Sequence, residues 1–216
     1  SKIDVSNPSN FESFDTGALA FWFKMSSTGV TFLLSLADIN TNDEYFQVMF
    51  GENASSNIED ESITLAFGQS FIYTKGGGTL YQDGAWHFCV LNFLEDGWEI
   101  WVDNVSQTVY TYSSPAYGFT SLLSSIDTVV LGGRKIKLND ALYEGSFNGL
   151  LDQPLIYNRT LTTEEVAELY AEGVGYEYPF SPDPSETFRY YQPVTVDHTV
   201  IDSPLYHFAV PINISA

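Results

Sequence analysis

Short apolar runs of four to eight residues, separated by polar turn signals, follow one another along most of this chain. Many of them are rich in aromatic and β-branched residues, which suit the half-buried surface of a β-sheet. No helical pattern separates consecutive runs, and this favours an antiparallel sandwich or jelly roll over a βαβ fold. The Glu-Asp-Gly segment at 95–97 signals a tight hairpin. We expect strands at residues 18–24, 31–36, 45–50, 62–67, 71–74, 86–93, 99–102, 107–112, 128–131 and 150–157.

One helix is indicated, near residues 162–172. Thr162 and Glu165 have the spacing of a capping box, in which each side chain bonds the backbone N–H of the other residue. Leu161 and Val166 occupy the positions of a hydrophobic staple, and we expect Gly173 to end the helix as a left-handed cap. The apolar face of this helix, which would lie against the sandwich, is formed by Val166, Leu169 and Tyr170.

The composition changes beyond this helix, so we divide the chain into a β-sandwich at residues 1–175 and a proline-rich arm at 176–216. Residues 179–185 are typical of a linker, and strand-like pieces follow at 192–196 and 208–214. An extended arm of this size cannot bury a core of its own. It must therefore pack on this sandwich, on a neighbouring subunit or on a following domain. The residues expected to make subunit contacts are Tyr191, Val194, Val196, Phe208, Val210 and Ile212.

Charge and composition narrow the classes of function. With 28 acidic and 8 basic residues, the chain has a formal net charge of −20. This excludes binding to a nucleic-acid backbone and a polybasic membrane anchor, since both need positive charge. No apolar run approaches the roughly 20 residues of a membrane span. The lone Cys89 excludes an internal disulfide and a four-cysteine zinc site. The first residues lack the pattern of a signal peptide, so we expect no export by that route if residue 1 is the true start.

Three stretches together resemble the laminin-G-like, concanavalin A-like lectin fold. Residues 18–25 (ALAFWFKM) are similar to the family's opening strand with its tryptophan. Residues 83–87 (DGAWH) and 99–104 (EIWVDN) look like the family's "DGxWH" and "lYvDG" pair, with Asn104 in place of the usual glycine. Residues 145–173 resemble the closing strand, capping box and helix, which is the most specific of the three matches.

The resemblance covers about residues 11–175. It implies two antiparallel sheets, one of them concave, with loops over the concave face that often bind glycans. Many members hold a structural calcium ion, and the resemblance makes Asp152 a candidate ligand. Calcium takes six to eight oxygen ligands, so Asp152 alone does not make a site and could instead pair with Arg159 or cap a turn. Residues 190–214 are similar to the start of a domain of unknown function found beside such modules in prokaryotic surface and phage proteins.

Catalytic patterns are missing from the sequence. Glycosidases of this fold place carboxylates in a Glu-x-Asp-x-Glu strand, so that two of them face one cleft about 5 Å apart. No such spacing occurs here, and the acidic residues 59–61 are typical of a solvated loop. His87, His198 and His207 do not have the spacing of a metal site. We therefore expect a protein that is not an enzyme.

Glycan recognition needs aromatic faces for the sugar ring and polar groups for its hydroxyls. Within residues 99–104, Ile100 and Val102 point one way, while Trp101 lies on a mixed polar and aromatic face that could be the concave one. Such aromatic residues could equally fill the core or a subunit interface. The basic segment 134–137 could dock on an acidic patch of a neighbour or form a solvated hairpin. The candidate glycan-binding residues are Trp101, Tyr112, Tyr117, Asn139, Asp140 and Tyr143.

We therefore expect a structural and adhesive surface protein, most simply a virion component such as a phage decoration or fibre protein. Its partners would be neighbouring subunits, reached through the arm, and cell-surface glycans, but neither nucleic acid nor membrane. Structural calcium is the one cofactor that the resemblance suggests. The alternatives are a carbohydrate-binding module of a larger secreted protein, a subunit of an extracellular filament, and a laminarinase-like glycosidase.

Overall fold

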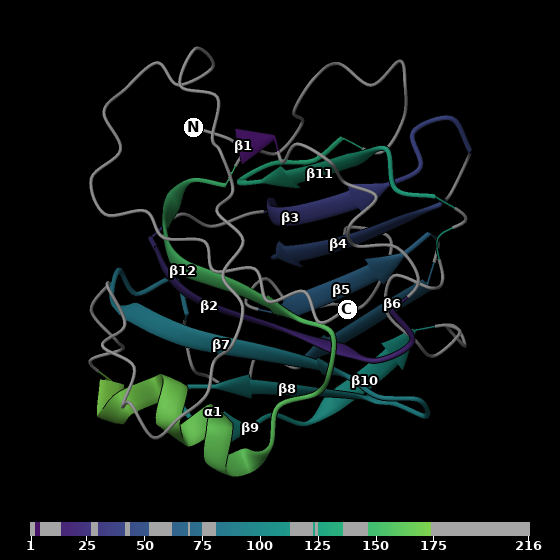
Figure 1. Ribbon diagram of the computed structural model, residues 1–216. Helices are drawn as coiled ribbons and strands as arrows, with labels where there is room; N and C mark the ends of the chain where they lie inside the picture. The colour runs from purple at the N-terminus through teal and green to yellow at the C-terminus, as the bar shows by residue number, and fades with distance from the viewer. Residues whose placement is uncertain are drawn as a thin grey trace, which may run out of the picture.

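Two antiparallel sheets pack face to face in a computed structural model of the chain (Figure 1). The structure describes residues 3–4, 14–26, 30–41, 44–51, 62–68, 70–74, 81–112, 123, 125–135 and 147–173. The seven-stranded sheet has the order β1 (Ile3–Asp4), β11 (Thr128–Leu131), β3 (Thr31–Ala37), β4 (Tyr45–Phe50), β5 (Ile63–Phe67), β6 (Ser70–Thr74) and β10 (Val109–Tyr112). The five-stranded sheet has the order β12 (Gly149–Tyr157), β2 (Gly17–Met25), β7 (Trp86–Phe93), β8 (Trp98–Val102) and β9 (Val105–Ser106).

The predicted all-β sandwich is confirmed, and every predicted strand range contains a strand. Strands β4, β7 and β11 have the predicted bounds, and the Leu94 N–H bonds the Gly97 carbonyl across the predicted hairpin turn at 2.9 Å. The sequence did not reveal β1 and β9, because strands of two residues are too short to show an alternating pattern.

The space between the sheets is filled by the inward-facing residues of both. Phe23 on β2 is fully buried at its centre, with its ring 4.6 Å from Phe50 on β4 and 5.5 Å from His87 on β7 between centroids. Cys89 lies in the same layer, where burial raises the pKa of its thiol well above the usual value. This agrees with the inert thiol expected for a cysteine in an apolar strand.

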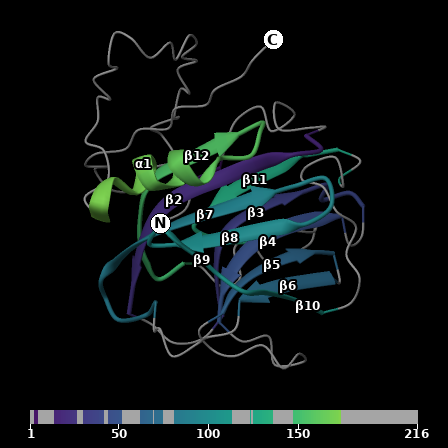
Figure 2. The same cartoon turned by 90° about the horizontal axis from the view of Figure 1, so that it is seen from below.

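Helix α1 (Thr163–Tyr170) covers the outer face of the five-stranded sheet (Figure 2). The predicted capping box is present, since the Glu165 N–H donates to Thr162 Oγ1 at 3.3 Å and the Thr162 N–H donates to Glu165 Oε2 at 2.9 Å. The end of the helix differs from the prediction. Ala171, not Gly173, takes the left-handed cap conformation at φ 45°, and a 3₁₀ turn at Ala171–Gly173 follows. Gly173 adopts a φ of 89° at the end of that turn.

One buried amide fixes the start of the helix to the sheet. Asn92 on β7 accepts a hydrogen bond from the Leu161 N–H at 2.9 Å and donates to the Leu161 carbonyl at 2.8 Å. Leu161 and Val166, the predicted staple, then belong to one buried apolar cluster with the outward residues of β2 and β7. We call this set the helix-side cluster; it contains Ala18, Ala20, Trp22, Phe88, Val90, Leu155, Leu161 and Val166.

The chain beyond Gly173 lies outside the described residues, and so do the predicted linker and arm. The proposed subunit contacts at Tyr191, Val194, Val196, Phe208, Val210 and Ile212 therefore stay predictions, as does the resemblance of the tail. Within the described part of the chain, no helix is long and apolar enough to cross a membrane.

Candidate functional site

The outer face of the seven-stranded sheet carries aromatic and polar side chains in cross-strand rows. Leu34, Val48 and Leu65 face the core, so their neighbours along each strand face outward. One outward row runs from Phe32 on β3 across to Tyr110 on β10, and a second begins at Ser35. We call this surface the polar-aromatic face; it consists of Phe32, Ser35, Gln47, Met49, Thr64, Ala66, Phe71, Tyr73 and Tyr110.

The centre of the polar-aromatic face is buried, yet it contains oxygen atoms that lack a hydrogen-bond partner. Gln47 is only 3% exposed and Thr64 is fully buried. Gln47 Oε1 and Thr64 Oγ1, together with Ser62 Oγ just before β5, have no partner among the described residues. A buried polar group without a hydrogen-bond partner destabilises the fold by about 1–3 kcal/mol, so a bound water molecule or a ligand group that bonds these atoms would be favourable.

The accessible side of this face lies on β6 and β10. Tyr73 and Tyr110 pair directly across the two strands, and their rings stack with centroids 5.9 Å apart and planes 26° apart. Tyr110 is 37% exposed, while Tyr73 is half-buried. Thr64 is the cross-strand neighbour of Tyr73 on the other side. An exposed aromatic platform therefore stands beside an unpartnered hydroxyl.

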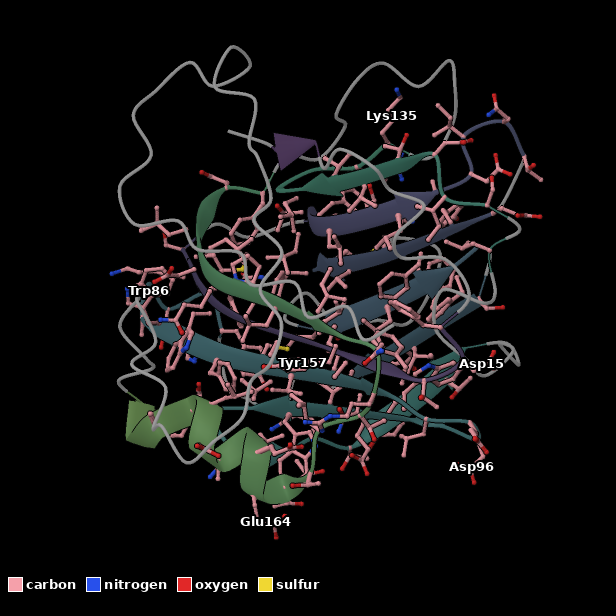
Figure 3. All side chains as sticks on the ribbon, viewed as in Figure 1. Asp15, Trp86, Asp96, Lys135, Tyr157 and Glu164 are labelled. Atoms are coloured by element: carbon pink, nitrogen blue, oxygen red, sulfur yellow. The ribbon has the colours of Figure 1, made fainter. Side chains whose placement is uncertain are left out.

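The Arg134 side chain and the Lys135 backbone lie against the other side of this face. The Arg134 guanidinium carbon is 4.8 Å from the centroid of the Phe32 ring, and the Lys135 N–H donates to Ser35 Oγ at 3.2 Å. Figure 3 labels Lys135 beside β11 and β3. These residues begin the basic segment 134–137, of which the remainder lies outside the described residues. Arg134 brings positive charge to the Phe32 end of this face in a chain with a net charge of −20.

Carboxylates do not line the central strands of this sheet. The sequences of β3, β4, β5, β6, β10 and β11 contain no Asp or Glu. The carboxylate pair that a glycosidase needs is therefore missing from these described strands.

The structure separates two of the predicted glycan-binding residues. Trp101 lies on β8 of the other sheet, half-buried against the helix-side cluster, because α1 covers the face toward which it points. Tyr112 is the last residue of β10, opposite Phe71, and so belongs to the sheet with the polar-aromatic face. Tyr117, Asn139, Asp140 and Tyr143 lie outside the described residues.

Sequence reasoning missed Gln47, Thr64, Tyr73 and Tyr110. The sequence did carry a signal for two of them, since Gln47 and Thr64 are each a single polar residue within a largely apolar strand. What the sequence could not supply was the strand register, which aligns Thr64 with Tyr73 and Tyr110 and places Gln47 in the neighbouring row with Ala66 and Phe71.

Asp152 does not by itself fit a calcium site. Its Oδ1 accepts the Gln153 N–H at 2.9 Å within the β-bulge of β12, where Gln153 has a φ of 47°. Arg159, its alternative partner, is instead bonded to both carboxylate oxygens of Glu165, at 2.6 and 2.8 Å. No group of three or more His, Cys, Asp or Glu side chains in the described part of the chain could hold a metal ion. Calcium binding through Asp152 stays a prediction.

His87 joins the two halves of the "DGxWH" and "lYvDG" motif pair. Its Nδ1 lies 2.7 Å from Asp103 Oδ2 and its Nε2 lies 3.2 Å from Asp83 Oδ1, while Asp103 Oδ1 accepts the Phe88 N–H at 2.9 Å. Hydrogen bonding, first to Asp103 and then to Asp83, raises the pKa of His87. Both ring nitrogens are occupied, so His87 serves as a structural tie and not as a catalytic base.

The raised pKa of His87 makes its contribution to stability dependent on pH. A folded pKa above the unfolded value means that protonated His87 stabilises the fold below about pH 6.5, and this stabilisation is lost as pH rises through the folded pKa. We expect His87→Gln to lower the free energy of unfolding more at pH 5.5 than at pH 9, measured by urea denaturation. Arg159→Gln, which removes an exposed ion pair, should cost the same at both pH values. An equal loss at both pH values for His87→Gln would contradict this assignment.

The chain is similar to one protein family and to several solved structures. Residues 1–167 match the family model of the concanavalin A-like lectin/glucanases superfamily. The CBM40 of Ruminococcus gnavus IT-sialidase, solved bound to α2,3 sialyllactose, has a TM-score of 0.57 and 13% identity, covering 76% of this chain and 91% of that chain. No curated protein sequence matches this chain significantly.

Two sialidases contain a similar fold. NanB from Streptococcus pneumoniae has a TM-score of 0.58 and 14% identity, over 78% of this chain and 26% of that chain. The leech intramolecular trans-sialidase has a TM-score of 0.54 and 16% identity, over 76% of this chain and 24% of that chain. This chain therefore spans about a quarter of each sialidase, and at such identities the likeness shows the fold alone.

Proposed function

Because this chain belongs to the concanavalin A-like lectin/glucanases superfamily, we propose that it is a non-catalytic module that binds a carbohydrate on its polar-aromatic face. The observation that carries the proposal is the stacked Tyr73–Tyr110 pair at the accessible side of that face. The apolar face of a sugar ring packs on an exposed aromatic ring, and nearby polar groups then select its hydroxyls.

The unpartnered oxygens of the polar-aromatic face, one of them next to Tyr73, fit a ligand rich in hydroxyl groups. Thr64 Oγ1, next to Tyr73, can both accept and donate, whereas Gln47 Oε1 can only accept. A sugar hydroxyl supplies the donor that these atoms lack. Both residues are buried, so the sugar ring would dock on the tyrosines, and its hydroxyls would reach Thr64 or Gln47 only if the surface above them opens.

The charge of this face suggests which sugars to test first. The Arg134 guanidinium lies at the Phe32 end of the face, and guanidinium groups pair with carboxylates. We propose that the preferred glycan carries a carboxylate. Sialyllactose, to which the structurally similar CBM40 is bound, is a suitable first probe, with lactose as its neutral counterpart.

Tyr110→Ala is expected to weaken binding of the best glycan about tenfold, because aromatic stacking contributes up to about 1.5 kcal/mol in addition to the apolar area that it buries. Isothermal titration calorimetry on the full chain, after a screen of acidic and neutral glycans, measures the change. Val105→Ala removes an apolar side chain that is 60% exposed on β9 of the other sheet and is the matched control. Unchanged affinity in Tyr110→Ala, or equal losses in both variants, would place the glycan elsewhere.

We propose a surface setting for this module. The setting proposed is a virion, and the alternatives are a module of a larger secreted protein and a filament subunit. Support for the virion role comes from the sequence alone: the acidic charge, the lone Cys89 and the proline-rich region 176–216. Light scattering at increasing concentration separates the two assembling settings from the third, because virion and filament subunits assemble whereas an isolated binding module stays monomeric.

A further inference from the structure

The outer face of the five-stranded sheet is covered unevenly by α1. Four rows of outward residues cross β12, β2 and β7. From the end of β12 back to its start, the β12 members of these rows are Tyr157, Leu155, Asp152 and Leu150. The rows that contain Ala18, Ala20 and Trp22 pack against the helix side. The last row is left open, and we call it the exposed row; it consists of Leu150, Lys24 and Trp86.

The exposed row presents an unusual amount of apolar surface. Leu150 is 57% exposed and Trp86 is 42% exposed, and the Lys24 side chain lies between them on β2. Burial of a large apolar side chain typically contributes about 1.5–3 kcal/mol, so a partner that covers both would be stabilised on this row. A lysine ammonium beside them also favours aromatic rings in that partner, through cation–π contact.

The chain itself leads from α1 to this row. Tyr170, the last residue of α1, stacks on Trp22 with ring centroids 5.9 Å apart and lies 6.3 Å from the ring of Phe88. Trp22 and Phe88 form one cross-strand row, and Lys24 and Trp86 belong to the next row along the sheet. Figure 3 shows α1 running from Glu164 toward the side of the molecule that carries Trp86. The helix therefore carries the chain toward the Trp86 end of the exposed row.

The residues that follow have the pattern of an extended apolar strip. In residues 174–180 (VGYEYPF), Tyr176, Tyr178 and Phe180 stand at alternate positions, which share one face of an extended chain. Pro179 favours extended backbone in the residue before it. Seven extended residues reach about 23 Å, whereas crossing from β7 to β12 takes only about 10 Å.

We propose that residues 174–180 pack in extended form across the exposed row, with their alternate aromatic rings on Trp86, Lys24 and Leu150. Residues 174–180 would thus cover the part of the outer sheet face that α1 leaves exposed. They would also hold the chain that follows them on the sandwich of the same molecule. This role differs from the subunit contacts expected of residues 191–212, and it does not depend on glycan binding at the other sheet.

Disulfide trapping in the full chain tests the proposal. Leu150→Cys is combined in turn with Tyr176→Cys, Tyr178→Cys or Phe180→Cys, and each variant is oxidised at low micromolar concentration. Cys89 does not interfere, because it is fully buried. Val105→Cys, 60% exposed on β9 at the far edge of the same sheet, is combined with the same three substitutions as the matched control.

We expect at least one Leu150 pair to form an intramolecular disulfide at least tenfold faster than its Val105 counterpart, as identified by peptide mass mapping. Two results would overturn the proposal. Disulfides that join two chains would show that a second copy occupies the exposed row, and cross-linking no faster than the control would show that residues 174–180 do not reach it. Neither result bears on the glycan-binding proposal, whose readout is affinity at the opposite sheet.

Discussion

Replacement of Asn92 by leucine is expected to lower the free energy of unfolding by about 2–5 kcal/mol, although the two side chains have nearly the same shape. The Asn92 amide satisfies both the N–H and the carbonyl of Leu161, and all of these groups are buried. Leucine would leave two backbone groups without partners, each at a cost of about 1–3 kcal/mol. Urea denaturation of the full chain measures the loss.

The effect of Asn92→Leu should be specific to the Leu161 bonds. Asn92 also donates to Glu99 Oε2 at 3.2 Å, so Glu99→Gln serves as the control. That variant keeps the oxygen acceptor and should change stability by less than about 0.5 kcal/mol. If Asn92→Leu lowered the free energy of unfolding by less than about 1 kcal/mol, the hydrogen bonds between Asn92 and Leu161 would not stabilise the fold as proposed.

Phe23→Ala is expected to be the most destabilising single truncation in the core, at about 3–5 kcal/mol. Phe23 is fully buried between the sheets, with Phe50 on one side and His87 and Tyr81 on others. These neighbours belong to separate strands and loops, so they cannot all move inward to fill the cavity. The loss of apolar burial is then added to the cost of an unfilled space.

Phe23→Leu is the matched control, because it removes the ring but keeps most of the apolar volume. We expect it to cost about 1–1.5 kcal/mol. Thermal unfolding followed by circular dichroism would show both changes as lower midpoints. Equal losses for leucine and alanine would mean that the ring contacts, and not the cavity, decide the stability at this position.

The two outer faces of the sandwich differ in a way that bears on function. Helix α1 occupies one face, so aromatic residues there, such as Trp101, are used for packing. The other face carries Tyr73 and Tyr110 at its accessible side, with Thr64 between them and the centre of the sheet. For this reason the glycan-binding proposal rests on the seven-stranded sheet.

The amino-acid sequence determined the local structure of this protein well. The apolar run WHFCVLNF indicated the bounds of β7 without error, and the Thr162–Glu165 spacing identified the capping box. Both patterns act within a few residues, so the backbone geometry of a strand or a helix start is sufficient to produce them. The closing motif also identified the family, because it combines a strand, a cap and a helix in order.

The tertiary structure alone decided which surfaces are free. Alternation showed that Trp101 and Ile100 face opposite ways, but only the packing of α1 shows that the Trp101 side is covered. The stacked Tyr73 and Tyr110 are far apart in the chain, and strand register brings them together. Such contacts depend on sheet order and on the position of one helix, which are fixed by the burial of the whole core and not by any local pattern.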